Sequence, residues 1–421
     1  MSSSLAEQIT EIGQQARRAS RALAILPPDR KNAILVAMAD ELVASSDAIL
    51  AANARDINGA EHHGLNKAAL DRLRLTRERI VKMADDIRQV ALLVDPVGQA
   101  ITEWTRPNGL RISKVRVPIG VVGIIYESRP NVTSDAAVLC IKTGNATILR
   151  GGSESIYSNI AIVEALQAGG AVAGLPEHSI QLIPTTDREA VPLMAQMDKY
   201  IDLIVPRGGH SLIETVVSHA RMPVIKHYHG VCHVYVDKDA DFDMAESIVV
   251  NAKSQRPGVC NSLETLLVHR DVAEGFLKKA GPAFVSEKIE LRGDEATRNI
   301  LGDQVIPATE DDWSTEYLDL IMSIRVVDDL EEAVDHMEKY GSHHSDAIVT
   351  RDPITAERFL AEVDSATVYW NASTRFTDGG EFGFGAEIGI STDKLHARGP
   401  MGLEELTTYK YLIRGQGQIR T

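Results

Sequence analysis

The chain has 421 residues, 44% of them apolar, and a formal net charge of −15. An acidic chain without a basic tract is a poor binder of nucleic acid or of anionic membranes. Three widely spaced cysteines, Cys140, Cys232 and Cys260, favour reduced thiols over a disulfide framework. Because the sequence has neither a signal-peptide pattern nor an apolar run of membrane-spanning length, it predicts a soluble, cytoplasmic protein of two or three domains.

Residues 5 to about 95 are predicted to be helical. Apolar side chains recur there at helical spacing, as in the set Ile80, Met83, Ile87 and Val90. Pro27-Pro28 marks the start of one of these helices. The pair His62-His63 is interpreted as a solvated helix end and not as a metal site, and no other pattern in the chain predicts a metal.

From Gly109 to Val117, apolar and charged residues alternate, which predicts a half-exposed strand or hairpin. Residues 121–126 are continuously apolar, as in a strand buried on both faces. Short apolar strands and helices then alternate as far as Val205, a pattern typical of βαβ units. A doubly wound, mostly parallel sheet is therefore expected, and nucleotide binding is its default function.

The stretch Ser254-Gln255-Arg256-Pro257-Gly258-Val259-Cys260-Asn261 joins a predicted helix to a predicted strand. Pro257 cannot donate a backbone hydrogen bond, and Gly258 allows a conformation closed to other residues. Such a turn could place Cys260 at the mouth of a cleft and leave its amide N–H to a ligand. Arg256 would favour the thiolate. On the turn alone, a nucleophile and a small buried core cysteine are equally good interpretations.

A second alternating region, residues 265–369, predicts another α/β unit that begins at this turn. A glycine-rich segment follows at residues 382–389. Residues 406–413 then form a strong strand pattern, and an edge strand near a terminus can pair with another subunit.

Seven stretches in chain order resemble the aldehyde dehydrogenase superfamily: residues 117–123, 126–133, 149–152, 205–209, 227–233, 256–261 and 399–404. The resemblance implies an α/β fold made of a Rossmann-type dinucleotide-binding domain, an α/β catalytic domain and a β-hairpin oligomerisation arm, assembled as a homo-oligomer. The implied boundaries are 1–103, 121–226 and 384–396 for the dinucleotide-binding domain, 227–383 for the catalytic domain, and 104–120 and 397–421 for the arm.

The same resemblance assigns roles in the chemistry. Cys260 matches the catalytic nucleophile, and Asn131 matches the asparagine whose amide holds the developing oxyanion together with the backbone N–H of Cys260. Arg129 and Arg256 lie near these motifs and are candidate contacts to the substrate.

Four further residues are implied to bind the cofactor. Gly208 and Gly209 match the loop that opens a helix beneath the dinucleotide. Glu316 aligns with a glutamate that hydrogen-bonds the nicotinamide ribose. Arg150 stands where the superfamily places a cation near the adenosine ribose, which favours NADP over NAD.

One departure from the superfamily pattern bears on the direction of the reaction. Aldehyde-oxidising members carry a glutamate that activates water, and His227 stands in its place here. The branch that this chain resembles uses NADPH to reduce L-glutamyl 5-phosphate to glutamate 5-semialdehyde in proline biosynthesis, through a cysteine thioester that water must not reach. Glutamate 5-kinase is a possible partner.

Two alternatives stay open. Another acyl-phosphate or acyl-thioester reductase of the same fold would use the same Cys260 and Asn131 on a different substrate, whereas an NAD-dependent oxidising dehydrogenase is disfavoured by His227. A non-catalytic dinucleotide-binding or assembly protein would show equal, slow labelling of all three thiols. A catalytic Cys260 would react fastest and be protected by substrate.

Overall fold

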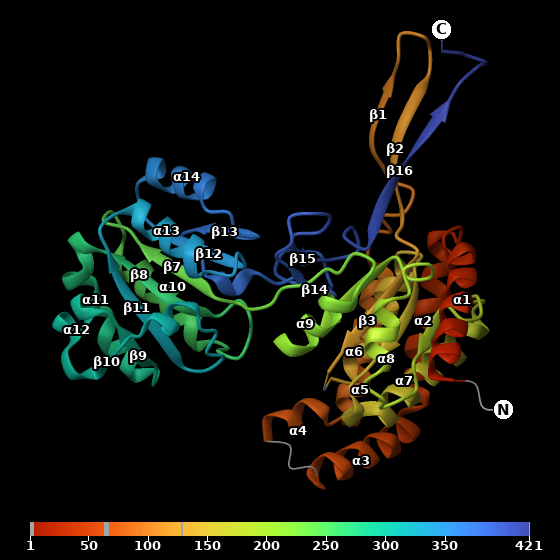
Figure 1. Ribbon diagram of the computed structural model, residues 1–421, viewed down its shortest axis with the longest axis horizontal. Helices are drawn as coiled ribbons and strands as arrows, with labels where there is room; N and C mark the ends of the chain where they lie inside the picture. The colour runs from red at the N-terminus through yellow and green to blue at the C-terminus, as the bar shows by residue number, and fades with distance from the viewer. Residues whose placement is uncertain (1–3, 63–66, 128, 421) are drawn as a thin grey trace. The chain divides into compact units, whose positions relative to one another are not determined.

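The structure is a computed structural model that describes residues 4–62, 67–127 and 129–420, and of residues 61, 62, 67 and 68 it describes the backbone alone. The His62-His63 pair therefore lies outside the described side chains. The chain divides into two compact units (Figure 1). The first comprises Met1–Lys226, Phe384–Gly389 and Met401–Thr421, and the second comprises His227–Gly383 and Ile390–Pro400. Residues 390–396, expected with the dinucleotide-binding domain, thus group with the second unit.

The N-terminal region is helical, as predicted. Its helices are α1 (Leu5–Leu23), α2 (Pro28–Ala44), α3 (Ser46–His62), α4 (Lys67–Leu73) and α5 (Arg77–Leu92). A reciprocal capping box starts α1: Ser4 Oγ accepts from the N–H of Glu7, and Glu7 Oε2 accepts from the N–H of Ser4. The apolar face predicted for α5, from Ile80 to Val90, is buried.

A parallel sheet lies at the centre of the first unit, in the strand order β5-β4-β3-β6. Its strands are β3 (Val121–Tyr126), β4 (Ala146–Arg150), β5 (Ile180–Leu182) and β6 (Leu203–Arg207). The connections are α6 (Asn131–Lys142), the 3₁₀ turn η1 (Ser153–Ser155), α7 (Ile156–Val172) and α8 (Ala190–Ala195), and α9 (His210–His219) follows the last strand. Every residue of β3 is buried, as expected of a strand covered on both faces.

A narrow antiparallel ribbon stands away from these layers (Figure 1). It consists of β1 (Ala100–Thr105), β2 (Arg111–Pro118) and β16 (Thr407–Arg414). β16 pairs with the whole of β2, from Thr407 opposite Pro118 to Arg414 opposite Arg111. The predicted hairpin and the predicted C-terminal strand therefore form a single sheet, and most of its side chains are exposed.

The second unit contains a parallel sheet in the order β10-β9-β11-β8-β7-β12-β13. Side chains from successive residues enter different cores: Val234 and Val236 pack on one face of the sheet, and Tyr235 packs on the other. The elements in chain order are β7 (Cys232–Val236), α10 (Phe242–Ser254), β8 (Leu263–His269), α11 (Arg270–Ser286), β9 (Glu290–Gly293), α12 (Glu295–Leu301), η2 (Gly302–Gln304), β10 (Val305–Pro307), η3 (Glu310–Ser314), β11 (Ile321–Val327), α13 (Leu330–Tyr340), β12 (Ser345–Val349), α14 (Pro353–Glu362), β13 (Thr367–Trp370) and η4 (Thr374–Phe376).

The prediction that the second unit begins at the turn before Cys260 is wrong, because β7 and α10 precede that turn. β7 has polar residues among its apolar ones, yet all five of its residues are buried. His233 is tolerated there because its ring Nδ1 lies 2.8 Å from Asp346 Oδ1 on β12. The short strands β14 (Gly389–Ser391) and β15 (Gly399–Met401) pair where the chain passes between the units. None of the described helices could cross a membrane.

Candidate active site

The strand order of the first sheet indicates where a ligand would bind. From β3 the chain moves outward to β4 and β5 and then returns to the other side of β3 with β6. In doubly wound sheets, ligands bind outside the carboxyl ends of the strands at such a switch point. Gly208 and Gly209 follow β6 at this position, and Gly209 is the N-cap of α9, so the predicted loop at a helix start is confirmed.

The side chain of Glu127 already accepts a hydrogen bond at this helix start. The N–H of Gly209 donates to Oε2 of Glu127, the residue after β3, at 2.9 Å. A Cβ on Gly208 would lie 2.4 Å from the same Glu127 oxygen, so a larger residue would fit only if the end of that side chain moved. The N–H groups at the start of a helix favour an anion, and Glu127 shows that this one accepts a negatively charged oxygen.

Asn131 is the first residue of α6, which follows β3. Its side-chain Nδ2 donates to Oδ2 of Asp135 at 2.8 Å, one helical turn further on. Burial raises the pKa of Asp135 to about 6, and the Asn131 hydrogen bond opposes this shift. Asp135 therefore fixes the orientation of the Asn131 amide. Arg129 precedes the helix and is exposed.

Arg150 ends β4, where the sequence predicted a cation, but its guanidinium is already engaged. The side chain is buried and donates to the carbonyl oxygens of Gly151 at 3.0 Å and Asp187 at 3.2 Å. Burial lowers the pKa of Arg150, and Arg188 contributes to the same shift. Arg188, which sequence reasoning missed, is exposed and adds a second positive charge next to Arg150.

In the second unit, Cys260 lies half-buried in the turn between α10 and β8, and the interpretation of a buried core cysteine does not hold. The two ends of this turn are joined by an ion pair without solvent exposure. Lys253 is in the last turn of α10 and Glu264 is on β8. Nζ of Lys253 lies 2.6 Å from Oε2 of Glu264. Burial raises the pKa of Glu264 and lowers that of Lys253. A pair of this kind strongly penalises any separation of the helix and the strand, since one charge would be left buried alone.

A glycine in a different segment lets the chain approach Cys260 closely. A Cβ on Gly230 would lie 1.9 Å from the carbonyl oxygen of Cys260, so no other residue fits without displacing the turn. Gly258, which would permit a conformation closed to other residues, does not have a positive φ, and its Cβ would meet nothing closer than 3.7 Å. The structural requirement for glycine is therefore at Gly230.

Two further side chains hold the Gly230 segment and the cysteine turn together. Oε1 of Glu316, the predicted ribose-binding glutamate, accepts from the N–H of Gly230 at 2.9 Å. The thiol of Cys232 donates to the carbonyl oxygen of Cys260 at 3.2 Å. Burial raises the pKa of Cys232 well above its ordinary value, so it stays a protonated donor. His227 starts the same segment, and its Nδ1 lies 2.8 Å from the carbonyl oxygen of Ile390.

The opposite side of the turn is held by η4. Nδ2 of Asn261 donates to the carbonyl oxygen of Thr377 at 2.8 Å, and the hydroxyl of Thr374 donates to the carbonyl oxygen of Asn261, also at 2.8 Å. This clasp brings Arg375 to the cysteine turn, where its Nε donates to Gln255 Oε1 at 2.8 Å. Sequence reasoning missed Arg375, because more than a hundred residues separate it from Cys260 and no local pattern marks it.

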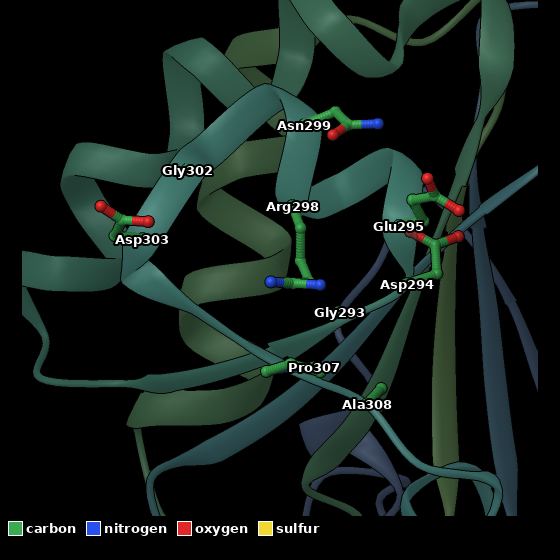
Figure 2. A pocket seen from close by; sticks show the side chains of 9 residues that line it. All are labelled: Gly293, Asp294, Glu295, Arg298, Asn299, Gly302, Asp303, Pro307 and Ala308. Atoms are coloured by element: carbon green, nitrogen blue, oxygen red, sulfur yellow. The ribbon is translucent and has the colours of Figure 1, made fainter.

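A pocket of about 380 Å³ lies elsewhere in the second unit, at the carboxyl end of β9. Figure 2 shows the Arg298 side chain directed into it, with Asp294 and Glu295 to one side. Asp294 is fully used by the fold, since its two oxygens accept from the N–H groups of Thr297 and Val326. None of the predicted site residues lines this pocket. Among the described residues no cluster of His, Cys, Asp or Glu could hold a metal ion.

Comparisons with known proteins agree on one family. A profile of the aldehyde dehydrogenase family matches residues 1–302. The chain is 58% identical to a gamma-glutamyl phosphate reductase of Moorella thermoacetica and 55% identical to one of Geobacter metallireducens, each over 99% of both chains. A crystal structure of gamma-glutamyl phosphate reductase from Thermotoga maritima superposes with a TM-score of 0.97 at 46% identity, covering 98% of this chain and all of that one.

Proposed function

This chain belongs to the aldehyde dehydrogenase family, and on that premise we propose that it reduces L-glutamyl 5-phosphate to L-glutamate 5-semialdehyde and phosphate, a step of proline biosynthesis. The observation that carries the proposal is the 58% identity, over 99% of both chains, to a gamma-glutamyl phosphate reductase. The family and fold class predicted from the sequence are confirmed. The geometry around Cys260 supports the chemistry in this chain.

Cys260 is the nucleophile in this proposal. Its thiolate attacks the acyl carbon, the carbon–oxygen bond to phosphate breaks, and a thioester forms. Phosphate is a stable leaving group and needs little protonation. Cys260 is half-buried, whereas Cys140 and Cys232 are buried; burial raises the pKa of Cys140 to about 12 and that of Cys232 well above its ordinary value. Cys260 is therefore the thiol best suited to the role.

Asn131 donates its side-chain amide to the oxyanion that develops on the acyl oxygen. The hydrogen bond from Asn131 to Asp135 supports this role because it sets the orientation of the amide before substrate arrives. Arg129 and Arg256 are candidate contacts to the anionic substrate. The absence of a carboxylate at His227 supports reduction, since no base is placed there to direct water onto the thioester.

Members of the aldehyde dehydrogenase family bind a nicotinamide dinucleotide, and the first unit fits one. The N–H of Gly209 at the start of α9 already donates to an anionic oxygen, and glycines there let the backbone approach a ligand closely. Gly208 and Gly209 would hold the pyrophosphate after Glu127 withdraws. Arg150 and Arg188 would favour the 2′-phosphate of NADP, and Glu316 is the proposed contact to the nicotinamide ribose. When bound, NADPH supplies the hydride that reduces the thioester.

The proposal extends to the assembly of the protein. The exposed sheet of β1, β2 and β16 is the arm through which a homo-oligomer would form, with 1–103, 121–226 and 384–396 binding the dinucleotide and 227–383 carrying the catalysis. The acyl phosphate is labile, so glutamate 5-kinase is the partner from which it would be received. The cytoplasm is the compartment that suits three cysteines without a disulfide.

The reverse reaction tests this function. Glutamate semialdehyde, supplied as pyrroline carboxylate, is incubated with NADP⁺, and NADPH is followed with and without inorganic phosphate. We expect strict dependence on phosphate. Turnover without phosphate would mean that water resolves the thioester and that the protein is an oxidising dehydrogenase. No turnover in either case would favour another acyl substrate or a binding protein.

A further inference from the structure

Two arginine side chains meet at the cysteine turn of the second unit. Arg256 belongs to the turn itself, four residues before Cys260, and Arg375 reaches it from η4 by donating its Nε to Gln255, the neighbour of Arg256. Arg256 and Cys260 both influence the pKa of Arg375, which burial and then the Arg256 charge lower. The thiol and both guanidinium groups are thus within electrostatic reach of one another.

Neither guanidinium is held in an ion pair by a described residue, although the charge of Asp378 acts on Arg375 and opposes the lowering of its pKa. Within residues 4–62, 67–127 and 129–420, no carboxylate forms an ion pair with Arg256 or Arg375, and the terminal nitrogens of Arg375 donate no hydrogen bond. Other arginines of the same unit behave differently: Arg292, Arg325 and Arg398 each hold a carboxylate within 2.8 Å. Two like charges kept together at a nucleophile, with no carboxylate in ion-pair contact, are stabilised when an anion arrives.

The position of Arg375 is also fixed from its backbone. Asn261, the residue after Cys260, bonds to both Thr374, the first residue of η4, and Thr377, the residue after η4, and Arg375 lies between them. Because Asn261 is adjacent to the nucleophile, any shift of Cys260 moves this clasp. A guanidinium held by the backbone and by its own Nε still presents its two terminal nitrogens, which match two oxygens of a carboxylate or phosphate.

We propose that Arg256 and Arg375 together bind an anionic group of the substrate beside Cys260. This inference rests on the proposed function and deepens it, because L-glutamyl 5-phosphate carries two such groups. Its phosphate is attached to the carbon that Cys260 attacks, and its α-carboxylate lies at the other end of the molecule. Both present oxyanions, and the experiment separates them.

The test measures the reverse reaction of the full chain at varied phosphate and, separately, at varied semialdehyde. Arg375→Gln removes the charge, and Arg375→Lys keeps the charge but loses the bidentate hydrogen bonding of the guanidinium. Arg358→Gln is the matched control, since Arg358 is an arginine of the same unit on α14 that pairs with Glu362 at the surface. A thermal melt of each variant verifies that it folds.

We expect Arg375→Gln to raise one KM roughly ten- to hundredfold, the effect of losing charged hydrogen bonds, with Arg375→Lys in between and Arg358→Gln unchanged. A rise in the KM for phosphate alone assigns the pair to the phosphate, and a rise in the KM for semialdehyde alone assigns it to the α-carboxylate. If a folded Arg375→Gln variant keeps both KM values, the proposal is wrong. Wild-type turnover that does not depend on phosphate would instead overturn the proposed function. In that case the KM for semialdehyde in the Arg375 variants would still test the arginine pair.

Discussion

The two units place their candidate functional residues at opposite ends of their parallel sheets. In the first unit, Glu127, Asn131 and Gly209 follow the carboxyl ends of β3 and β6. In the second unit, Cys260 precedes the amino end of β8. The first location obeys the general rule for doubly wound sheets, where helix starts supply donors for an anion. The second does not, and its geometry depends on specific contacts.

This difference shows what each unit has to supply. A dinucleotide site can be built from backbone donors that every βα turn offers, so alternating short strands and helices predict it as a default, and the family resemblance adds the two glycines. A nucleophile on an α-to-β turn has no such scaffold. Cys260 is held by a buried ion pair beneath the turn, by Gly230 and Cys232 on one side and by Asn261 on the other. We therefore expect the second unit to be the more sensitive to small changes near its site.

The largest expected effect comes from Cys260→Ser. An alkoxide is not accessible at neutral pH, so the reverse reaction should fall by roughly a thousandfold or more. Cys140→Ser in the first unit is the control and should retain most of the activity, because Cys140 is a fully buried thiol. NADPH formation measures both. Comparable activity in the two variants would remove Cys260 from the mechanism.

In the first unit, Asn131→Ala should lower kcat by roughly a hundred- to a thousandfold, as the loss of an oxyanion donor does elsewhere. Asp135→Asn keeps a partner for the amide and should cost far less. Steady-state kinetics at saturating cofactor provides the measurement. An unchanged kcat in Asn131→Ala would show that the oxyanion is held by other donors.

A pair of glycine variants sharpens the comparison within the second unit. Gly230→Ala forces a Cβ to within 1.9 Å of the Cys260 carbonyl oxygen, whereas Gly258→Ala, in the cysteine turn itself, meets nothing closer than 3.7 Å. We expect Gly230→Ala to slow both turnover and alkylation of Cys260 by roughly tenfold or more, at a cost of about 1–3 kcal/mol of strain. Gly258→Ala should stay near wild type. The reverse ranking would mean that the turn, and not its neighbour, sets the position of the thiol.

A different kind of effect, on stability and not on turnover, is expected in acid. Burial lowers the pKa of His336 to about 2 and that of His344 to about 3, and both lie in the second unit. Unfolded histidines titrate near 6.5, so these two contribute stability above that pH and lose it as the pH falls. Each of these histidines lowers the free energy of unfolding by roughly 1.4 kcal/mol for every pH unit below 6.5.

The first unit responds in the opposite direction at Asp135, where a raised pKa means that protonation on acidification favours the folded state. Hydrogen exchange followed by mass spectrometry at pH 7 and pH 5 should therefore show the second unit losing protection first. His336→Phe should reduce the difference. Equal loss in both units would contradict the assignment of the buried histidines as the cause.

Much of the fold could be predicted, because hydrophobic periodicity is a local property. The N-terminal helices, β3 and the strand at residues 407–414 were all indicated by pattern. β7 was missed because the polar side chain of His233 is satisfied by Asp346 on a strand more than a hundred residues later. Sequence alone does not show which polar residue will find a buried partner.

The same limit applies to the site. The turn around Cys260 was predicted from local composition, whereas the loop at Gly208 and Gly209 was implied by the family resemblance. The requirement for glycine at Gly230, the clasp at Asn261 and the position of Arg375 come from segments that meet only after folding. Arg150 was located correctly at the end of β4, but its bonds to Gly151 and Asp187 depend on a loop that the pattern did not place.

The pairing of β16 with β2 has a consequence for synthesis. Thr407 accepts a hydrogen bond from the Arg116 guanidinium and is synthesised 291 residues after it. At 5–20 residues per second, the β1–β2 hairpin waits roughly 15–60 s for its third strand. A two-stranded ribbon is marginally stable in water, so the arm stays incomplete until residues 407–414 have been synthesised. An oligomer that uses this arm could form only between chains that already contain β16, which would keep shorter nascent chains on neighbouring ribosomes from joining too early.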